Sequence, residues 1–254
     1  MCIRDSCDSS INDGGWGAAC YNAMIAAAEK MGWETEVTDS ISQDAYYDSI
    51  VAYCTLGYDM IYAPGNQYTD AVLQAAEEYP DVQFVAMTGD TARADGLANF
   101  HNAFTGIYEA RYVGGVVAGM KLQQLIDEGK VEDKNKTADG KIKIGYVGAY
   151  PYAEVVSGYT AFFLGLQSIV PDVAMQVQYT NSWFNITAEN EAAKALIADG
   201  CIIVSQHADS MGAPTACELA GIPNVSYNGS TGKACPNTYI ISSRINWAPY
   251  YEYA

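Results

Sequence analysis

The sequence has few basic residues and no long apolar run. Its 254 residues include 13 lysines and arginines against 30 aspartates and glutamates, which gives a formal net charge of −17. A surface of this sign repels phosphates, so nucleic acid is excluded as a partner. No apolar stretch approaches the length of a bilayer span, so no membrane-spanning helix is predicted. The chain is long enough to bury one large core or two moderate ones.

Catalytic and metal-binding motifs are missing as well. The two histidines, His101 and His207, lie far apart, and there is no Ser–His–Asp order, GxSxG elbow, HExxH helix or GxxxxGK[ST] loop. Gly14-Gly15 resembles half of a dinucleotide fingerprint, but the third glycine is absent. The cysteines form no CxxC and no Cys/His cluster, so no metal and no cofactor are predicted. The chain is therefore predicted to bind a ligand without catalysing a reaction.

The cysteines are predicted to be structural. Cys20, Cys54 and Cys201 fall inside apolar patterns and are typical of small buried side chains. Cys217 and Cys235 could form a disulfide or remain thiols, and the spacing leaves both open.

The most informative stretch present is Asn12-Asp13-Gly14-Gly15-Trp16, directly before a long helical pattern. Asn12 or Asp13 can cap that helix, and the glycines allow a tight turn. Trp16 is expected to be exposed in the first helical turn, near the positive end of the helix dipole. A site that stacks a flat ligand and hydrogen-bonds its edge would explain an aromatic residue there.

Helical and strand patterns alternate along the chain, which predicts parallel sheets flanked by helices. Helices are predicted over residues 15–31, 42–56, 66–79, 108–126, 153–169, 186–198 and 213–219. Strands are predicted over residues 34–38, 59–62, 82–87, 98–104, 141–147, 173–179, 201–205, 224–227 and 238–242. A charged loop is expected over 127–140.

The restart of this pattern predicts two α/β lobes joined by a hinge. The first lobe covers residues 7–104, with 243–254 returning to it, and the second covers 105–242. No strand pattern precedes Asn12, and a further crossover would be expected after Ala254, so the chain is interpreted as a fragment without its first strand and C-terminal part. Residues 1–6 fit no downstream pattern, and their back-translation resembles a transposon adaptor used in library preparation, so they are interpreted as an artefact.

Ligands of open α/β sheets bind beyond the carboxyl ends of the strands, where this chain has polar and aromatic loops. Two facing lobes would hold a planar heterocycle between Trp16 and either Trp183 or Phe184. Structural alternatives stay open: Asp13 as a cap, Asp90 as a turn residue, and Trp183 or Phe184 as packing for the next helix. His207 could instead bond a neighbouring loop. The candidate ligand-binding residues are Asn12, Asp13, Trp16, Asp90, Trp183, Phe184, His207, Asp209, Tyr227 and Asn228.

With these loops in view, the chain resembles the basic membrane protein family of substrate-binding lipoproteins of ABC importers. The motifs that carry the resemblance run in matching order from about residue 8 to the end: 12–16, 108–112 leading into 115–119, 143–148, 180–184, 206–210, 227–228 and 246–251.

The resemblance implies a type I periplasmic-binding-protein fold and a purine ligand. It implies that Trp16 stacks the base, with Asp13 and Asp90 as polar partners, and that Trp183 or Phe184 supplies the opposing face. Nucleoside-binding members carry a lysine where this chain reads Ser243-Arg244-Ile245-Asn246-Trp247. The loop around His207 also replaces a glycine-rich loop of those members, so the chain resembles the branch associated with free bases such as adenine. Base and nucleoside both remain open.

The expected protein is thus an extracytoplasmic lipoprotein that captures a purine by hinge closure and delivers it to ABC permease subunits. Its lipid anchor would lie outside this fragment. A sugar-binding or sensory receptor domain on the same fold is the alternative, because sugar sites also stack aromatic rings. An α/β enzyme is a further alternative, disfavoured by the missing catalytic motifs.

Overall fold

A computed structural model of the chain describes residues 2–7 and 9–253, with residues 2–6 described by their backbone alone. The chain divides into two compact units: Met1–Thr105 with Ile245–Ala254, called unit 1, and Gly106–Arg244, called unit 2. The lobe boundaries expected from the sequence, 104/105 and 242/243, fall one and two residues before these divisions.

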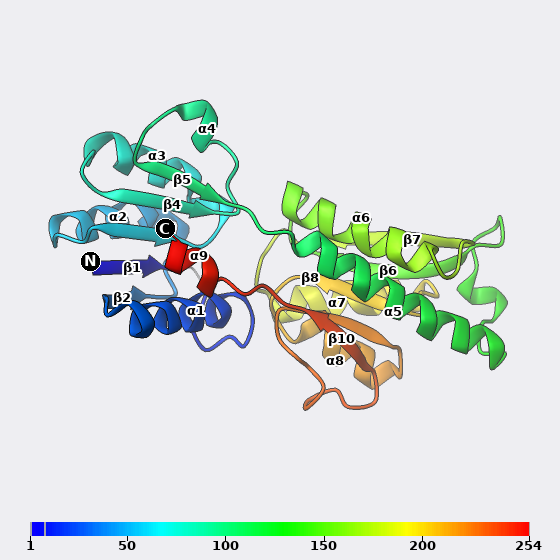
Figure 1. Cartoon of the computed structure of the whole chain (residues 1–254). Coiled ribbons are helices and arrows are strands. Elements are labelled where there is room, and N and C mark those ends of the chain that lie inside the picture. The colour runs from blue at the N-terminus through cyan, green and yellow to red at the C-terminus, as the bar shows by residue number, and fades with distance from the viewer. Residues whose placement is uncertain (1, 8, 254) are drawn as a thin grey trace. The chain divides into compact units, whose positions relative to one another are not determined.

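Unit 1 is a five-stranded parallel sheet between helices (Figure 1). The sheet has the order β2-β1-β3-β4-β5, and its register pairs β1 with both β2 and β3. Its elements are β1 (Cys2–Ser6), α1 (Trp16–Met31), β2 (Glu34–Thr38), α2 (Tyr46–Thr55), β3 (Met60–Ala63), α3 (Thr69–Glu78), β4 (Gln83–Met87), α4 (Ala92–Asp95), β5 (Phe100–Ala103) and α9 (Ala248–Tyr253).

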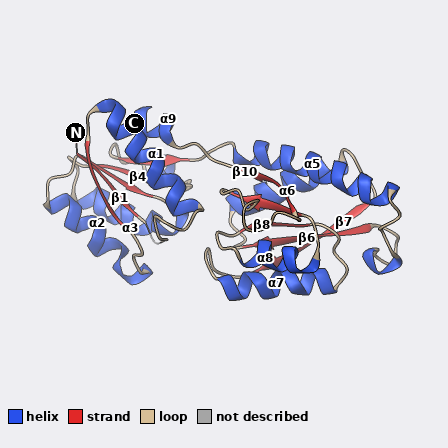
Figure 2. Cartoon of the chain, turned by 90° about the horizontal axis from the view of Figure 1, so that it is seen from below, coloured by secondary structure: helices blue, strands red, loops and turns tan. Residues whose placement is uncertain are grey.

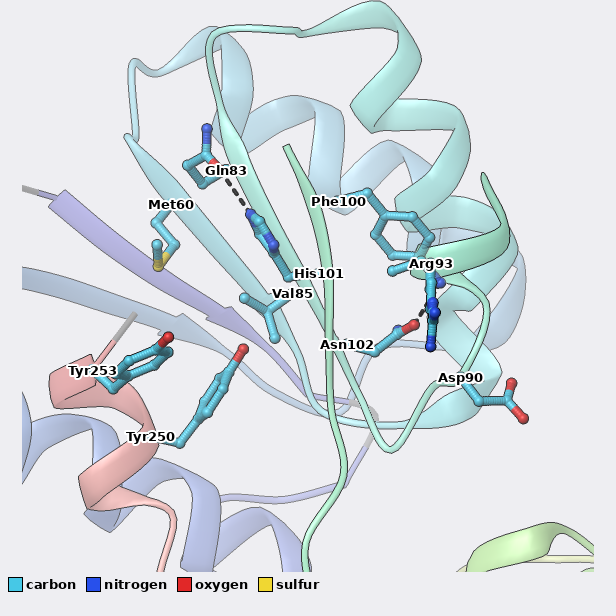
Figure 3. A pocket seen from close by; sticks show the side chains of 11 residues that line it. Met60, Gln83, Val85, Asp90, Arg93, Phe100, His101, Asn102, Tyr250 and Tyr253 are labelled. Atoms are coloured by element: carbon cyan, nitrogen blue, oxygen red, sulfur yellow. Dashed lines mark hydrogen bonds between the residues drawn. The ribbon is translucent and has the colours of Figure 1, made fainter. Parts of the chain in front are cut away.

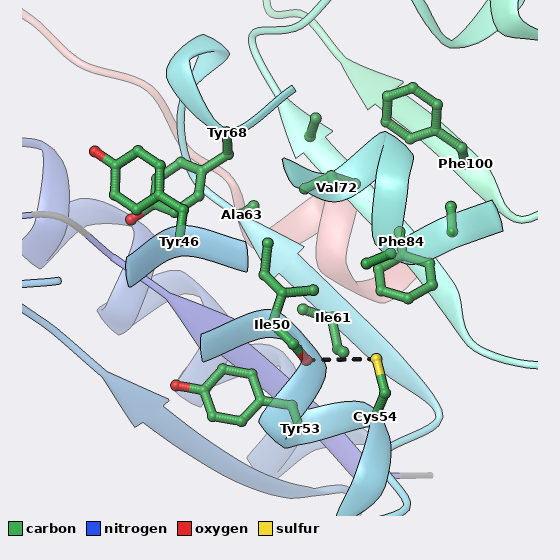
Figure 4. Close-up of a cluster of buried hydrophobic side chains, with 13 residues drawn as sticks. Tyr46, Ile50, Tyr53, Cys54, Ile61, Ala63, Tyr68, Val72, Phe84 and Phe100 are labelled. Atoms are coloured by element: carbon green, nitrogen blue, oxygen red, sulfur yellow. Dashed lines mark hydrogen bonds between the residues drawn. The ribbon is translucent and has the colours of Figure 1, made fainter. Parts of the chain in front are cut away.

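Alternation along β3 explains why both faces of this sheet are covered. Met60 and Tyr62 pack toward α1 and α9, whereas Ile61 and Ala63 pack toward α2 and α3. Side chains of successive strand residues point to opposite faces, so a continuous apolar run is typical of a strand buried on both sides. Figure 4 shows the second of these cores, in which Tyr46 and Tyr68 stack with ring centroids 3.9 Å apart.

Unit 2 repeats this architecture with the strand order β10-β9-β8-β6-β7. Helices α5 and α6 cover one face of its sheet and α7 and α8 the other (Figure 2). Its elements are α5 (Ile107–Asp127), β6 (Ile142–Gly148), α6 (Ala153–Gln167), β7 (Val173–Tyr179), α7 (Ile186–Ala198), β8 (Val204–His207), α8 (Gly212–Ala220), β9 (Asn224–Tyr227) and β10 (Tyr239–Ser243).

Helices α5 and α6 approach closely because both carry glycines where their backbones meet. A Cβ atom on Gly115 would lie 2.0 Å from the carbonyl oxygen of Phe162, and one on Gly165 would lie 2.1 Å from that of Tyr112. These glycines therefore serve close helix packing.

Several sequence expectations require correction. The expected absence of a strand before Asn12 is wrong, because β1 hydrogen-bonds to strands on both sides. Strand β8 starts at Val204 rather than at Cys201, and the short helices α4 and α9 were not predicted. The expected charged loop over 127–140 contains a 3-10 turn, Asp133–Asn135, closed by a capping box between Glu132 and Asn135.

The adaptor-like origin of residues 1–6 stays a prediction.

Among the described residues no helix is both long and apolar enough to cross a bilayer.

Candidate functional site

Both sheets have the same doubly wound strand order when the strands of each unit are numbered from 1 to 5 along the chain. That order, 2-1-3-4-5, places a crevice where the chain reverses its direction of winding, at the carboxyl ends of the first and third strands. In unit 1 the crevice lies between β1 and β3, and in unit 2 between β6 and β8. The loops that leave these strands are therefore the candidate positions for side chains that bind a ligand.

In unit 1, Asp13 lies just before helix α1 and caps its first turn. Its carboxylate accepts backbone N–H bonds from Gly15 at 2.7 Å, Gly17 at 2.9 Å and Ala18 at 3.0 Å. Of the two cap candidates, Asp13 performs this role and Asn12 is an exposed side chain. The Asp13 oxygens thus satisfy N–H groups that the first helical turn leaves without partners.

The expectation that Trp16 is exposed is wrong. Its side chain is 8% exposed, and its indole Nε1 donates to the carbonyl oxygen of Pro64 at 2.7 Å. The ring also packs edge-on against Trp247 of the C-terminal segment, with centroids 5.7 Å apart. An apolar ring in the first turn is explained by this core, into which α1 and α9 both pack.

Asp90 follows β4, is exposed, and lines a cavity of about 900 Å³ on the α9 side of the unit 1 sheet. Tyr250 and Tyr253 stand at one end of this cavity, and Asp90 and Arg93 at the other (Figure 3). His101 lies on the cavity wall, with its Nε2 2.9 Å from Gln83 Oε1.

Unit 2 gathers five aromatic rings at its strand ends, here called the aromatic cluster: Tyr150, Tyr152, Trp183, His207 and Tyr227. Tyr150 and Tyr152 stack with centroids 5.0 Å apart, and Trp183 lies 5.4 Å from Tyr150 and 6.1 Å from Tyr152. His207 lies 6.2 Å from Trp183 and 4.2 Å from Tyr227. Tyr150 and Tyr152 follow β6, Trp183 follows β7, and His207 and Tyr227 are the last residues of β8 and β9, so the cluster lies at the carboxyl ends of the strands beside the β6–β8 crossover point.

Backbone bonds fix the loop that carries Trp183. The Asp209 N–H donates to the carbonyl oxygen of Trp183 at 2.9 Å. The buried carboxylate of Glu189 accepts the N–H of Asn185 at 3.1 Å and that of Ser210 at 3.2 Å. Burial raises the pKa of Glu189, which these N–H donors partly oppose. The loops after β7 and β8 are therefore held together from beneath.

Two buried charged side chains, Arg111 and Glu154, contact the cluster through Tyr227. Arg111 is fully buried, with Cζ 4.2 Å from the centroid of the Tyr227 ring and Nη1 donating to Gln206 O at 3.0 Å. Glu154 is also buried; its Oε1 accepts the Tyr227 hydroxyl at 3.4 Å and lies 3.7 Å from His207 Nε2. Burial, and then the charge of Arg111, lower the pKa of His207, while Glu154 opposes the shift. Burial also raises the pKa of Tyr227 well above its usual value, so both rings are uncharged at neutral pH.

Several buried polar atoms of this region have no hydrogen-bond partner within the described part of the chain. Buried polar groups are nearly always satisfied, by protein, water or ligand. Most of the unpartnered atoms are donors, so the region is suited to a molecule with hydrogen-bond acceptors. They are Trp183 Nε1, His207 Nδ1 and Nε2, Arg111 Nε and Nη2, and Asn228 Oδ1.

The expected site residues thus fall into two groups. Trp183, His207, Tyr227, Asp209 and Asn228 lie together in unit 2, where the Asn228 amide donates to Asp209 at 3.4 Å. The sequence left open whether Trp183 or its neighbour Phe184 supplies an aromatic face. Trp183 contacts other rings of the cluster, whereas Phe184 is 47% exposed. Asn12, Asp13, Trp16 and Asp90 belong to unit 1.

Sequence reasoning did not single out Arg111, Glu154 or Glu189. A signal for Arg111 was present, because it shares one helical face with Gly115, Ala118 and Leu122, all of them buried. A charge in such a stripe indicates a buried functional or structural role. No comparable pattern marks the two glutamates, since an acidic residue near a helix start is common.

Among the described residues, no group of three His, Cys, Asp or Glu side chains is arranged to hold a metal ion. Cys217 and Cys235, whose pairing the sequence left open, are buried free thiols, and burial raises the pKa of Cys217 to about 12.

Two doubly wound parallel sheets, one in each unit, are the architecture of the periplasmic-binding-protein fold. A solved ABC transporter solute-binding protein from Aeropyrum pernix has this fold, with a TM-score of 0.81 at 16% identity over the whole chain and 69% of that structure. The chain belongs to the PnrA-like family of ABC transporter substrate-binding proteins, whose model matches residues 6–254. This confirms the resemblance to the basic membrane protein family. It is a family of binding proteins rather than enzymes, and such proteins act outside the cytoplasm.

Two curated relatives are similar over nearly all of this chain. One is a putative ABC transporter glucose-binding protein of Haloferax volcanii, 33% identical over 96% of this chain and 57% of its own length. The other is a purine-binding protein of Brucella abortus, 32% identical over 94% of this chain and 63% of its own length. The chain therefore spans about three fifths of the length of these relatives.

Proposed function

We propose that this chain binds the solute of an ABC importer, and that the solute is a purine base or a purine nucleoside. The observation that carries the proposal is the aromatic cluster at the crevice of unit 2, with the buried, unpartnered indole N–H of Trp183 in it. Planar heterocycles stack on such rings, and ring nitrogens accept hydrogen bonds from such donors. The Brucella abortus relative that is called purine-binding supports the same ligand class.

Each group of the cluster has a chemical task in this proposal. Tyr152, which is 38% exposed, supplies ring surface for stacking. Trp183 Nε1 and uncharged His207 hydrogen-bond the edge of the heterocycle, together with the Asn228 amide. Of the unit 1 candidates, the oxygens of Asp13 and the indole N–H of Trp16 are engaged within the fold.

A sugar is the second candidate ligand, and one observation favours it. The relative from Haloferax volcanii, named as a putative glucose-binding protein, is as similar to this chain as the purine-binding relative. Aromatic rings also stack on the apolar faces of sugars, so the cluster by itself is compatible with both. Both a purine ring nitrogen and a sugar hydroxyl can accept a hydrogen bond from the Trp183 N–H, so direct titration with each ligand is what separates the two candidates.

Substitution of Trp183 tests the proposal. We expect Trp183→Ala to weaken binding of adenine or adenosine at least tenfold, because the indole N–H bond to the ligand and the ring contacts within the aromatic cluster are both lost, roughly 1–3 kcal/mol together. Trp183→Phe keeps a ring but removes the N–H, and should cost about 1 kcal/mol or more for the unmade bond to a buried acceptor. Isothermal titration calorimetry with adenine, adenosine, guanosine and glucose measures both effects.

The matched control is Tyr112→Ala, which removes a half-exposed aromatic ring of α5 outside the aromatic cluster. Its affinity should equal that of the unmodified chain. Tight binding of glucose with no purine signal would replace the purine by a sugar, and equal purine affinity in all variants would remove the aromatic cluster as the site.

For the whole protein, we propose an extracytoplasmic, lipid-anchored receptor that delivers its ligand to ABC permease subunits. Metabolic labelling of the native protein with a fatty acid, followed by surface proteolysis of intact cells, tests the anchor and the location together. A native protein that takes up no fatty acid and resists external protease would contradict both.

A further inference from the structure

Arg111 is a buried cation to which the proposed function assigns no task. Its side chain is fully buried on α5, yet its polar contacts are one bond to the Gln206 carbonyl and the face of the Tyr227 ring. Burying a guanidinium costs several kcal/mol unless neighbouring groups compensate it. A buried guanidinium with so few polar contacts therefore indicates a role in the structure or function of the residues around it.

Three features connect Arg111 with His207: a hydrogen bond to the preceding residue, a shared aromatic neighbour, and a glycine next to both side chains. Gln206, whose carbonyl accepts from Arg111, precedes His207 in β8, so the guanidinium fixes the strand end that carries the imidazole. Tyr227 lies against both Arg111, at 4.2 Å, and the His207 ring, at 4.2 Å. On α6, Gly158 leaves the necessary space: a Cβ there would lie 3.2 Å from His207 Nδ1 and 3.7 Å from Arg111 Cγ.

The charges around His207 balance only while its ring is neutral. Arg111 on α5 and Glu154 on α6 are of opposite sign, and the hydroxyls of Tyr227 on β9 and Tyr146 on β6 are uncharged at neutral pH. Asp209, in the loop after β8, is partly exposed and bonds Asn228. A proton on His207 would add a second buried cation next to Arg111 with Glu154 as the shared counter-charge.

We propose that Arg111 is a positioning residue for the aromatic cluster: it fixes the end of β8 and excludes a proton from His207, so that His207 meets the ligand as a neutral ring. The consequence for purine affinity rests on the proposed function, whereas the effect on His207 itself does not. In this role Arg111 acts through its contacts with the Gln206 carbonyl and the Tyr227 ring.

The test is a titration of the histidine side chains by two-dimensional NMR of the full chain. The chain has two histidines, so His207→Gln assigns the signals, and His101 in unit 1 serves as an internal control. In the unmodified chain, burial and the neighbouring Arg111 should keep the titration midpoint of His207 below the ordinary histidine value of 6.5. Arg111→Met should raise its titration midpoint by about one pH unit or more, because a neighbouring cation is removed.

Two further variants separate charge from shape. Arg111→Lys keeps the cation, so His207 should stay neutral as in the unmodified chain, and Glu154→Gln should move the midpoint in the opposite direction to Arg111→Met. A midpoint of His207 at or above 6.5 in the unmodified chain overturns the proposal, and so does an Arg111→Met chain that leaves it in place. The first outcome needs no variant, so the proposal remains testable if Arg111→Met does not fold.

Calorimetry with adenosine between pH 5.5 and 8 provides the second readout. The affinity of Arg111→Met should begin to fall at a higher pH than that of the unmodified chain, by up to tenfold for each pH unit below its own His207 midpoint. A role confined to stability would lower affinity equally at all pH values. If no purine binds but the His207 titration behaves as expected, the proposed function fails and the positioning role of Arg111 stands. If purines bind but the His207 midpoint does not move, the reverse holds.

Discussion

At the scale of the residue, Asp13 and Trp16 show how a motif can serve the fold where it was expected to serve a ligand. The sequence permitted Asp13 as a cap, and its carboxylate accepts three N–H bonds at the start of α1. For Trp16 the sequence indicated an exposed platform, but its N–H bonds Pro64 and its ring is buried. Exposure could not be predicted because it depends on Trp247, more than two hundred residues away in the chain.

Removing the Asp13 carboxylate should therefore lower stability. We expect Asp13→Ala to reduce the free energy of unfolding by about 1–2 kcal/mol, the range for loss of a helix cap. Urea denaturation followed by circular dichroism measures this. The neighbouring change Asn12→Ala is the control, because its side chain is exposed and should alter stability by about 0.5 kcal/mol or less. Equal stabilities of the two variants would remove the capping role.

At the scale of the element, most helices and strands follow from the sequence, and the exceptions have physical causes. Strands β2, β7 and β9 and helix α7 have the bounds that the pattern predicts. Strand β1 was missed because its sequence includes Arg4 and Asp5, whereas central parallel strands usually read as apolar runs. Strand β8 was placed too early because the apolar residues before Val204 were taken as the strand. Its polar residues are buried instead, with Ser205 donating to the Val225 carbonyl.

The contact between α5 and α6 gives a sharp element-scale prediction. Gly115→Ala should destabilise unit 2 by about 1–3 kcal/mol, because the new methyl group would meet the backbone oxygen of Phe162 and the helices would have to move apart. Thermal unfolding followed by circular dichroism measures the change.

The adjacent Gly114 provides the matched control. Its added Cβ would lie 3.4 Å from a Val225 methyl group, and alanine favours a helix over glycine by up to about 1 kcal/mol. Gly114→Ala should therefore be neutral or stabilising. The close-packing explanation fails if Gly115→Ala is as stable as Gly114→Ala.

At the scale of the whole molecule, the two units are built from the chain differently. Unit 2 is one continuous segment with its own cores on both faces of its sheet. Unit 1 also needs the last ten residues, because Trp247 and Tyr251 are 1% and 0% exposed in its core. The stability of unit 1 thus depends on a segment that the chain supplies only after unit 2 has been completed.

Truncation after Arg244 tests this dependence. Without Trp247 and Tyr251, the core around Trp16 opens, and loss of each buried aromatic ring costs roughly 3–5 kcal/mol. We expect limited proteolysis with mass spectrometry to find residues 106–244 protected and residues 1–105 digested. In the uncut chain both units should resist together. Equal protection of both units after truncation would contradict the role of the C-terminal segment.

The sequence by itself determined the repeated strand–helix order, the two-unit division, the absence of catalytic motifs and the polar and aromatic loops at the carboxyl ends of the strands. These follow from local periodicity and from the rule that parallel strands present their carboxyl ends at one edge. Only the tertiary structure decided that Trp16 belongs to a core, that Trp183 joins four other rings, and that Arg111 lies buried beside His207. Burial and partners depend on residues distant in the chain, which no local pattern records.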